Sequence, residues 1–355
     1  MYITHIKLLN FRNYKNLEID LNKNINIFYG DNGQGKTNII ESVFLCGMGK
    51  SFRTNKEQEL INLEDKFSEI EISFQKKDRD GNIKIILENK KSIFFNGVKI
   101  KKLSDLLGKI NVVLFSPDDL EILKEGPNKR RRFLDMMISQ LRPNYIYCLN
   151  LYLKTLEQRN NYLKQIKLEK KDENLLDIWD EKLAEYAEKI VKYRLEFMEK
   201  IKSKINKIHQ EITDEKENFE ISYITEAITK EEWLEKLNQS RKLDIIKGYT
   251  TKGIHRDDFL IFINGKQVNI YGSQGQNRTV ILSLKLTELK IIEEEIGEEP
   301  ILLLDDFMSE LDEKRRNRLV KIMQKTQVLI TCTDPMELKN LNSKFFKVEN
   351  AKINE

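Results

Sequence analysis

The chain is poor in the residues that build disulfide frameworks and metal centres. Of its 355 residues, 3 are cysteines and 3 are histidines. Cys46, Cys148 and Cys332 are widely separated in the sequence, and the histidines show no metal-ligand spacing. A disulfide scaffold and a structural zinc site are therefore excluded, and the composition favours a reduced, cytoplasmic setting.

Long apolar runs and a large net charge are also missing. No apolar run approaches the roughly 20 residues needed to span a bilayer, and residues 1–5 lack the pattern of a signal peptide. We therefore expect no membrane association. The net charge is only +4 although 33% of the residues are charged, so a nucleic-acid surface must come from local basic clusters.

Glycine is missing from one long block of the chain. None of the 15 glycines lies between Pro127 and Lys247, and apolar residues recur at spacings of three and four over 145–163 and again over 179–212. This spacing is typical of helices with one buried face. We predict two antiparallel helices joined by a charged hairpin, the longer on the order of 50 Å at 1.5 Å per residue.

One motif that is present is specific for phosphate binding. Residues 30–37 fit the pattern G-x-x-x-x-G-K-[ST], with a short apolar strand expected before them and a helix after them. In this context backbone N–H groups and a helix N-terminus bind phosphate. We predict that the nucleotide-binding residues of this loop are Gly30, Asp31, Asn32, Gly33, Gln34, Gly35, Lys36 and Thr37.

A second motif supplies the acidic groups that a nucleotide site needs. The apolar run at 301–304 ends in Asp305 and Asp306. Such a run suits a strand buried on both faces of a parallel sheet, and ligands bind at the carboxyl ends of such strands. We predict that Lys36 reaches the β- and γ-phosphates of ATP and that Thr37 and Asp305 hold Mg²⁺. Asp306 is the predicted catalytic residue, orienting and deprotonating the attacking water.

A third motif points to a second copy of the chain. Residues 272–276 precede a helical pattern, and their S-x-G-Q core resembles the signature of ABC-type ATPases. One chain has little use for two anion-binding turns on one triphosphate. We therefore predict that Ser273, Gly275 and Gln276 contact nucleotide bound by a partner copy, with an ordinary helix-start turn as the alternative. Residues 309–312 resemble the D-loop of the same class.

These features define the expected fold class. It is α/β: a P-loop ABC-type ATPase head with mixed β-sheets, interrupted by a mainly helical arm. We expect residues 1–118 and 248–355 to form the head and residues 119–247 to form the arm. A hairpin of strands at 258–263 and 267–270 is expected after the arm.

Nearly the whole chain resembles the RecF family of bacterial DNA replication and repair proteins. Besides the three motifs, the strings that carry the resemblance are LLNFRNY at 8–14, GKSFRT at 49–54, FSPDDL at 115–120, GPNKRRRFLD at 126–135 and HRDD at 255–258. The phosphate loop alone indicates only a P-loop NTPase, whereas the arginine block and the SPDDL and HRDD strings are more specific.

The resemblance implies a protein that binds ATP and Mg²⁺, forms an ATP-dependent homodimer and binds single-stranded, duplex and gapped DNA. It implies a recombination mediator that works with RecO and RecR in gap repair, replication restart and the SOS response to DNA damage. It also implies a weak DNA-stimulated ATPase used as a switch.

Three positions depart from the generic ABC pattern. Residues 116–118 put Ser-Pro-Asp at the Q-loop position, Asp306 stands where many such ATPases have glutamate, and Thr-Cys-Thr at 331–333 replaces a common switch histidine. Aspartate is one methylene shorter than glutamate, and a threonine hydroxyl can bond the γ-phosphate but cannot act as a cation. We therefore expect slow hydrolysis that times a switch.

Three basic clusters are candidates for DNA contact. They are Lys129 with Arg130, Arg131 and Arg132, Lys99 with Lys101 and Lys102, and Lys50 with Arg53. Basic side chains on phosphates give affinity without reading sequence. For each cluster, a solvated helix start or salt bridges to the glutamates of the arm are an equal alternative, and Arg53 is also a candidate for nucleotide contact.

Two other functions compete with this interpretation. A nuclease of the overcoming-lysogenization type with an ABC head would need a further acidic metal-binding domain, for which 355 residues leave no room. A transporter motor subunit would need a membrane partner at the Q-loop position. Recovery of the protein with membranes or with gapped DNA would discriminate between these classes.

Overall fold

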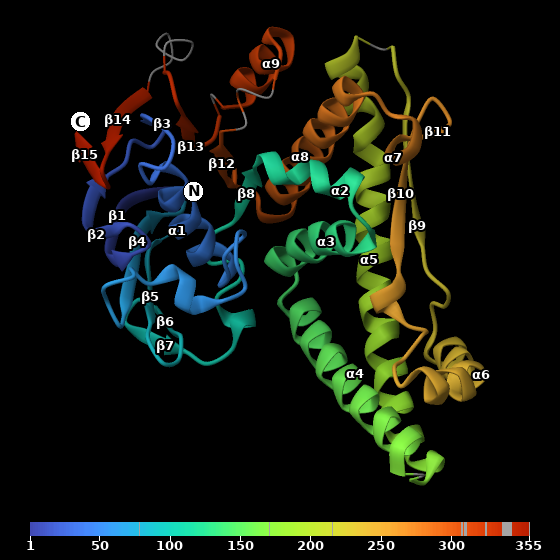
Figure 1. Ribbon diagram of the computed structural model, residues 1–355. Coiled ribbons are helices and arrows are strands. Elements are labelled where there is room, and N and C mark those ends of the chain that lie inside the picture. Colours follow the sequence, from blue (N-terminus) through green and yellow to red (C-terminus); the bar gives the residue numbers. More distant parts are fainter. Residues whose placement is uncertain are drawn as a thin grey trace. The chain divides into compact units, whose positions relative to one another are not determined.

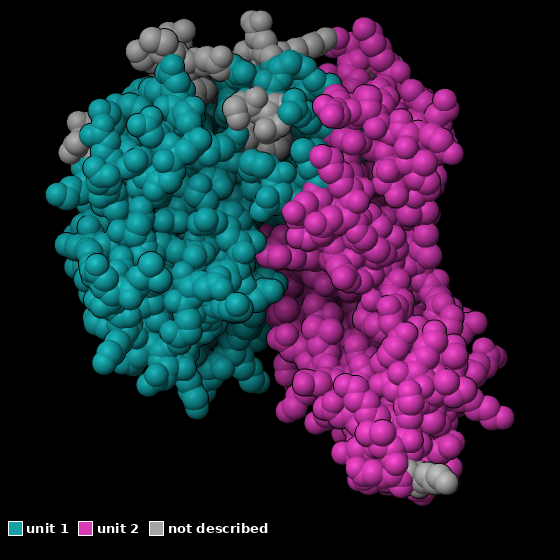
Figure 2. All heavy atoms as spheres, in the orientation of Figure 1, with its two compact units in different colours: residues 1–120, 278–355 teal, residues 121–277 magenta. Residues whose placement is uncertain are grey.

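The chain divides into two compact units, which Figure 2 shows in different colours. The computed structural model describes residues 1–77, 79–169, 171–214, 216–306, 308, 311–323, 325–335 and 343–354. The first unit comprises residues 1–120 and 278–355, and the second comprises residues 121–277. The first boundary lies near the predicted one, but the second lies at 277/278 rather than at 247/248.

The elements of the two units are labelled in Figure 1. The first unit contains β1 (Tyr2–Phe11), β2 (Tyr14–Asp20), β3 (Ile25–Tyr29), α1 (Lys36–Met48), β4 (Ser68–Gln75), β5 (Asp80–Leu87), β6 (Ser92–Phe95), β7 (Val98–Ile100), β8 (Val112–Phe115), β12 (Ile301–Asp305), α9 (Glu313–Met323), β13 (Val328–Cys332), β14 (Ser343–Glu349) and β15 (Lys352–Asn354). The second unit contains α2 (Glu121–Lys124), α3 (Pro127–Leu141), α4 (Pro143–Glu169), α5 (Leu176–Thr213), β9 (Phe219–Ile224), α6 (Lys230–Lys247), β10 (Asp258–Ile263), β11 (Lys266–Gln267) and α7 (Val268–Tyr271). Helix α8 (Gln274–Ile296) begins in the second unit and continues in the first.

The first unit is built on two six-stranded sheets with α1 packed against both. One sheet is antiparallel, in the order β2-β1-β4-β5-β6-β7. The other has the order β15-β14-β3-β13-β12-β8 and is parallel except for the edge hairpin of β14 and β15. Helix α1 contacts β4 of the first sheet and β12 and β13 of the second, and for this reason it is buried from Ile39 to Met48.

The parallel sheet aligns the strand ends that matter for the predicted site. Strand β13 lies between β3 and β12, and its register places Thr331 opposite Asp305 and Cys332 opposite Tyr29. Strands β3, β12 and β13 therefore end at the same edge of the sheet. This is the edge at which open α/β sheets bind ligands.

The second unit combines long helices with a three-stranded sheet. Helices α4 and α5 run side by side in Figure 1, as the two predicted apolar stripes require. Strand β10 pairs with both β9 and β11. The pairing of β9 with β10 explains the shifted boundary, because it brings residues 248–277 into the same unit as the helical arm.

The hairpin predicted after the arm is only partly present. Strand β10 matches the prediction, but the second strand is limited to Lys266–Gln267 and the chain then forms the short helix α7. No helix in the described part of the chain is both long and apolar enough to cross a membrane.

Candidate functional site

The phosphate loop joins β3 to α1, and its shape depends on glycine. Gly30 and Gly35 have φ values of 142° and 114°. A Cβ atom at Gly30 would stand 2.4 Å from the carbonyl oxygen of Val348 on β14, so both the torsion and the available space require glycine there. The chain thereby turns sharply at the carboxyl end of β3 into the first turn of α1, the arrangement that binds anions.

Lys36 begins α1 and folds back over the loop. Its Nζ donates to the carbonyl oxygens of Gly30 at 2.6 Å and Asp31 at 2.9 Å, and the residue is 4% exposed. These carbonyl groups are neutral acceptors. A phosphate oxygen would be a stronger partner for the ammonium group, because charge-assisted hydrogen bonds are about twice as strong as neutral ones.

Asp305 is the centre of a hydrogen-bonded group formed by the ends of the strands and α1. Its Oδ1 accepts hydrogen bonds from Thr37 Oγ1 and Thr331 Oγ1, each at 2.8 Å. Burial raises the pKa of Asp305; the two hydroxyls act against this shift, and the neighbouring Asp306 adds to it. The two side chains predicted to hold Mg²⁺, Thr37 and Asp305, are thus in direct contact.

The residues around Asp305 fit a cation that is shared with a ligand. Among the residues that the structure describes, no group of three or more His, Cys, Asp and Glu side chains is placed to hold a metal ion. A Mg²⁺ ion at Thr37 and Asp305 would therefore need phosphate oxygens and water as its other ligands. This is the usual mode of Mg²⁺ binding at nucleotide sites.

Asp306 differs from Asp305 in both conformation and exposure. It leaves β12 in the left-handed region with φ 47°, and its backbone N–H donates to Thr331 Oγ1 at 2.9 Å. Asp306 is partly exposed, whereas Asp305 is buried. The predicted general base is therefore the more exposed of the two aspartates.

The threonine at the predicted switch position supports these acidic residues. Thr331 is fully buried, donates to the carboxylate of Asp305 and accepts from the N–H of Asp306. Both hydrogen bonds of the Thr331 hydroxyl are made to residues at the end of β12, whereas Thr333 is exposed. The motif analysis did not single out this supporting role, which is visible only once β12 and β13 are placed next to each other.

Further residues support the phosphate loop from other segments. Asn13 donates to the carbonyl of Gln34 at 3.1 Å, and the hydroxyl of Tyr14 donates to the carbonyl of Gly35 at 3.3 Å. The side chain of Gln34 accepts from the N–H of Asn350 at 2.6 Å. The string at 8–14 contained Asn13 and Tyr14, but nothing in the sequence indicated which group they contact.

Arg53 belongs to a polar group on the side of α1. Arg12 binds the buried carboxylate of Glu41 in bidentate fashion, at 2.9 and 2.7 Å. Arg53 adds an ion pair with Glu41 at 3.3 Å and donates to Asn38 at 2.8 Å, and its side chain is 41% exposed. Arg53 is thus close to the loop but only partly covered, and the neighbouring Lys50 is exposed.

The signature residues lie at the start of α8, in the second unit. The hydroxyl of Ser273 accepts from the N–H of Gln276 at 3.2 Å, and Oε1 of Gln276 accepts from the N–H of Ser273 at 3.0 Å. This reciprocal pair has the pattern of a capping box. Ser273 and Gly275 are exposed, as contact with a partner copy would require.

Part of the predicted D-loop lies outside the described residues. Of residues 309–312, Ser309 and Glu310 are not described. Leu311 is buried, and Asp312 accepts from the N–H of Arg315 at 2.9 Å at the start of α9.

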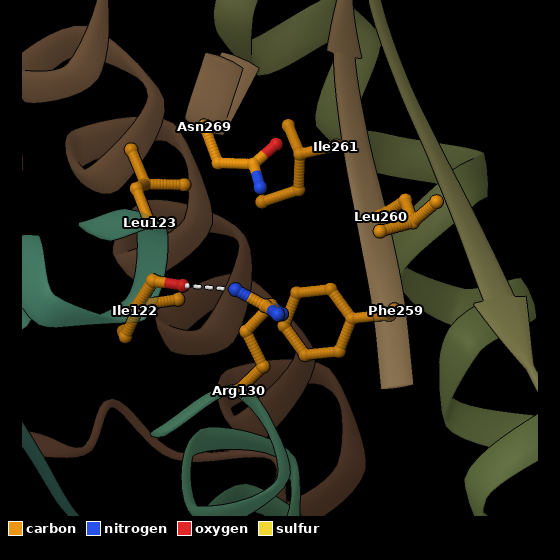
Figure 3. Close-up of a pocket in the computed structure, with 7 residues that line it drawn as sticks. All are labelled: Ile122, Leu123, Arg130, Phe259, Leu260, Ile261 and Asn269. Atoms are coloured by element: carbon orange, nitrogen blue, oxygen red, sulfur yellow. Dashed lines mark hydrogen bonds between the residues drawn. The ribbon is translucent and has the colours of Figure 1, made fainter. Parts of the chain in front are cut away.

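Arg130, a member of the arginine cluster predicted to contact DNA, forms its contacts inside the second unit. Arg130 is 6% exposed, and its guanidinium binds both carboxylate oxygens of Asp258 at 2.6 and 2.9 Å. Figure 3 shows it directed into a small pocket beside Phe259, where Nη1 donates to the carbonyl of Ile122. This geometry favours a structural role for Arg130.

The other predicted DNA contacts are more accessible. Arg131 donates to the carbonyl of Asp257, and burial lowers its pKa. Arg132 is partly exposed, and the lysines of the second cluster, at 99, 101 and 102, are exposed. Lys129 forms an ion pair with Glu121.

Comparison with known proteins extends the similarity over the full chain. The family model described as "RecF/RecN/SMC N terminal domain" matches residues 2–354. A curated relative from Clostridium perfringens strain SM101, "DNA replication and repair protein RecF", is 44% identical over 362 residues, which cover 99% of each chain.

Two solved structures confirm the predicted fold class. One, described as "Structure of the recombination mediator protein RecF-ATP in RecFOR pathway", is 40% identical with a TM-score of 0.93 and covers 99% of this chain and 97% of that chain. The other is a Smc head domain from Pyrococcus furiosus, bound to the C-terminal domain of ScpA, which is 17% identical with a TM-score of 0.58. It covers 99% of this chain and 95% of that chain and shows a shared fold alone.

Proposed function

The chain belongs to the RecF family of DNA replication and repair proteins, and on that premise we propose that it is an ATP-dependent DNA-binding recombination mediator acting in the cytoplasm. The observation that carries the proposal is the 2.8 Å contact between Thr37 and Asp305, which joins the phosphate loop to the acidic strand end. Lys36 lies over the same loop. The relative with 40% identity was solved with ATP.

The nucleotide site assigns a distinct task to each residue. The loop N–H groups of residues 30–37 and the start of α1 bind the phosphates, and Lys36 exchanges its carbonyl partners for phosphate oxygens. Thr37 and Asp305 hold Mg²⁺, which neutralises phosphate charge when bound. Asp306 orients the attacking water and accepts its proton. Its short side chain makes hydrolysis slow, so that ATP times a switch.

The signature completes the site in a second copy of the chain. The exposed Ser273 and Gly275 face nucleotide bound by the partner, and Gln276 fixes the turn that carries them. ATP then holds the homodimer together, and hydrolysis releases it.

DNA contact relies on basic residues that remain accessible. Arg132 is partly exposed, and Lys50 and Arg53 are exposed. These three residues are therefore better candidates for DNA contact than Arg130. Arg131 is an intermediate candidate. We propose that the protein binds at single-strand gaps in DNA. There it acts together with RecO and RecR to help load recombinase. The RecFOR pathway of the solved relative supports this assignment.

Binding to three DNA forms tests the proposal. Affinity for single-stranded, duplex and gapped DNA is measured with and without Mg²⁺–ATP at two salt concentrations, because phosphate contacts make affinity fall steeply with salt. We expect ATP to strengthen binding, most of all to gapped DNA. Lys36→Ala is expected to lose nucleotide binding and with it every effect of ATP. Binding that is indifferent to ATP in the unchanged protein would contradict the proposal.

A mixing experiment tests the composite site. Ser273→Arg is expected to keep nucleotide binding in the single subunit but to block ATP-dependent dimerisation, because a bulky cation does not fit at a closed interface. A Lys36→Ala subunit has an intact signature, and a Ser273→Arg subunit has an intact phosphate loop. Mixing the two should partly restore the dimer, as measured by sedimentation with ATP. Normal dimerisation of Ser273→Arg alone would reduce residues 272–276 to a helix-start turn.

A further inference from the structure

The signature turn is connected to the arm by a chain of side-chain contacts. Gln276 Nε2 donates to Glu217 Oε1 at 2.7 Å. The other carboxylate oxygen of Glu217 is 3.1 Å from Nε2 of His209, near the end of α5. Because Gln276 also forms the capping box with Ser273, these contacts run without interruption from α5 to the signature serine. All four residues belong to the second unit.

The inner end of this chain of contacts is fixed by packing. His209 is fully buried, and its ring lies edge-on to Phe219, with the ring centroids 5.2 Å apart. Asn206, one turn earlier on α5, accepts the N–H of Phe219 at 2.8 Å. Glu217 is therefore carried by a segment tied to α5, and its carboxylate has a defined position.

The side-chain amide of Gln276 forms a hydrogen bond through its oxygen and another through its nitrogen. Oε1 accepts from the backbone of Ser273, while Nε2 donates to Glu217. An amide has one acceptor and one donor end, so a flip of this side chain would lose both contacts. Glu217 thus sets the orientation of Gln276, and Gln276 sets the turn at Ser273.

This orientation determines what Ser273 can offer to a ligand. The hydroxyl oxygen accepts from the N–H of Gln276, which places the oxygen against the helix start and leaves the hydroxyl hydrogen to donate. An anionic phosphate oxygen is the acceptor that such a donor suits best.

We propose that Glu217 is a positioning residue for ATP-dependent dimerisation, holding Gln276 so that Ser273 presents its hydroxyl to nucleotide bound by a second copy of the chain. The inference rests on the composite site proposed above. It makes the end of α5 part of the nucleotide switch, because displacement of Glu217 releases the side chain that completes the capping box.

Glu217→Ala tests the proposal, with Glu220→Ala as the matched control. Glu220 is an exposed glutamate on the adjoining strand β9, so its removal changes the charge equally. We expect Glu217→Ala to bind nucleotide as a single subunit like the unchanged protein but to need about tenfold more protein for half-maximal dimer with ATP, the effect of one lost hydrogen bond to a charged group. Glu220→Ala should dimerise normally. Normal dimerisation of Glu217→Ala overturns the inference, and absence of an ATP-dependent dimer in the unchanged protein overturns the composite site itself.

An exchange of the two side chains separates positioning from a general loss of structure. Gln276→Glu alone places two carboxylates against each other and should impair dimerisation, although glutamate is a good capping-box residue. The double variant Glu217→Gln with Gln276→Glu restores a donor facing an acceptor and should bring dimerisation back toward that of the unchanged protein. Thermal unfolding of each variant reports on folding independently. A double variant that folds normally and stays as defective as Gln276→Glu overturns the inference.

Discussion

Two buried groups, one in each unit, use charge in opposite ways. At the phosphate site, the buried Asp305 is bonded to the neutral hydroxyls of Thr37 and Thr331, and burial raises its pKa. In the arm, Arg159 is fully buried between the carboxylates of Asp180 and Asp244, at 2.6 and 2.7 Å, and Arg241 is a second cation on Asp180 at 2.8 Å. A carboxylate held by neutral groups still gains from a cation, whereas paired charges are already neutralised. The comparison therefore separates a ligand site from a structural cluster.

The same distinction explains the strings that identify the family in the arm. Asp258 of HRDD pairs with Arg130 of the arginine block, and Asp257 and Asp135 both pair with Arg194 on α5, at 3.1 and 3.0 Å. Arg194 is almost fully buried. These four members of the two strings each pair with a residue in another segment, and the pairs help to hold the second unit together.

Removal of Arg159 should have the largest effect. Arg159→Ala leaves the fully buried carboxylate of Asp244 without its cation, while Asp180 keeps Arg241 at 2.8 Å. We therefore expect the free energy of unfolding to fall by about 3–5 kcal/mol. Lys36→Ala is the contrasting change, with loss of nucleotide binding but little change in stability. Urea denaturation of both variants measures the contrast. A loss of less than about 1 kcal/mol for Arg159→Ala would remove the distinction between the two clusters.

The next effect concerns catalysis at Asp306, the partly exposed aspartate. Asp306→Asn keeps the size of the side chain but removes the group that accepts a proton. We expect ATP to bind normally, hydrolysis to fall by about two orders of magnitude and the ATP-bound dimer to last longer. Single-turnover hydrolysis and sedimentation check these outcomes. Unchanged hydrolysis would assign the general base to another residue.

Features that depend on local sequence could be predicted closely. The apolar stripes over 145–163 and 179–212 correspond to α4 and α5. The hairpin was harder to predict. The pattern over 267–270 fits one longer strand as well as the observed two-residue strand followed by a turn of helix. The domain boundary was missed because the pairing of β9 with β10 is not local.

The candidate site shows the same limit. The phosphate loop and the acidic pair are contiguous motifs, and the structure joins them through Thr37 and Asp305. The support from Thr331 and the link from Glu217 to Gln276 depend on segments distant in the sequence, which no spacing rule connects. A basic cluster likewise does not reveal that Arg130 is buried, because its partner Asp258 lies 128 positions away.

The smallest expected effect is a pH dependence that has opposite signs at two groups, His255 in the second unit and Asp305 in the first. His255 is partly buried in the arm, with Nδ1 2.9 Å from the hydroxyl of Tyr152 and Nε2 3.3 Å from the carbonyl oxygen of Thr250. Burial lowers the pKa of His255 from 6.5 to about 4. Between these values the unfolded chain binds a proton that the folded chain does not, so stability rises with pH in this window. The raised pKa of Asp305 acts the other way, because there the folded chain holds the proton more tightly.

The histidine contribution can be isolated by comparison with a variant that lacks the titrating group. On lowering the pH from 7 to 5, His255 should cost the folded state about 2 kcal/mol, since each pKa unit corresponds to about 1.4 kcal/mol. His255→Gln keeps polar atoms at this position but does not titrate, so its free energy of unfolding should fall by about 2 kcal/mol less over the same interval. Urea denaturation at pH 7, 6 and 5 without nucleotide measures both proteins, and the difference between the two curves cancels Asp305 and the other titrating groups. If the free energy of unfolding falls equally in both proteins, His255 takes up a proton while the arm stays folded. The arm would then accept a positive charge, as we propose for the phosphate site.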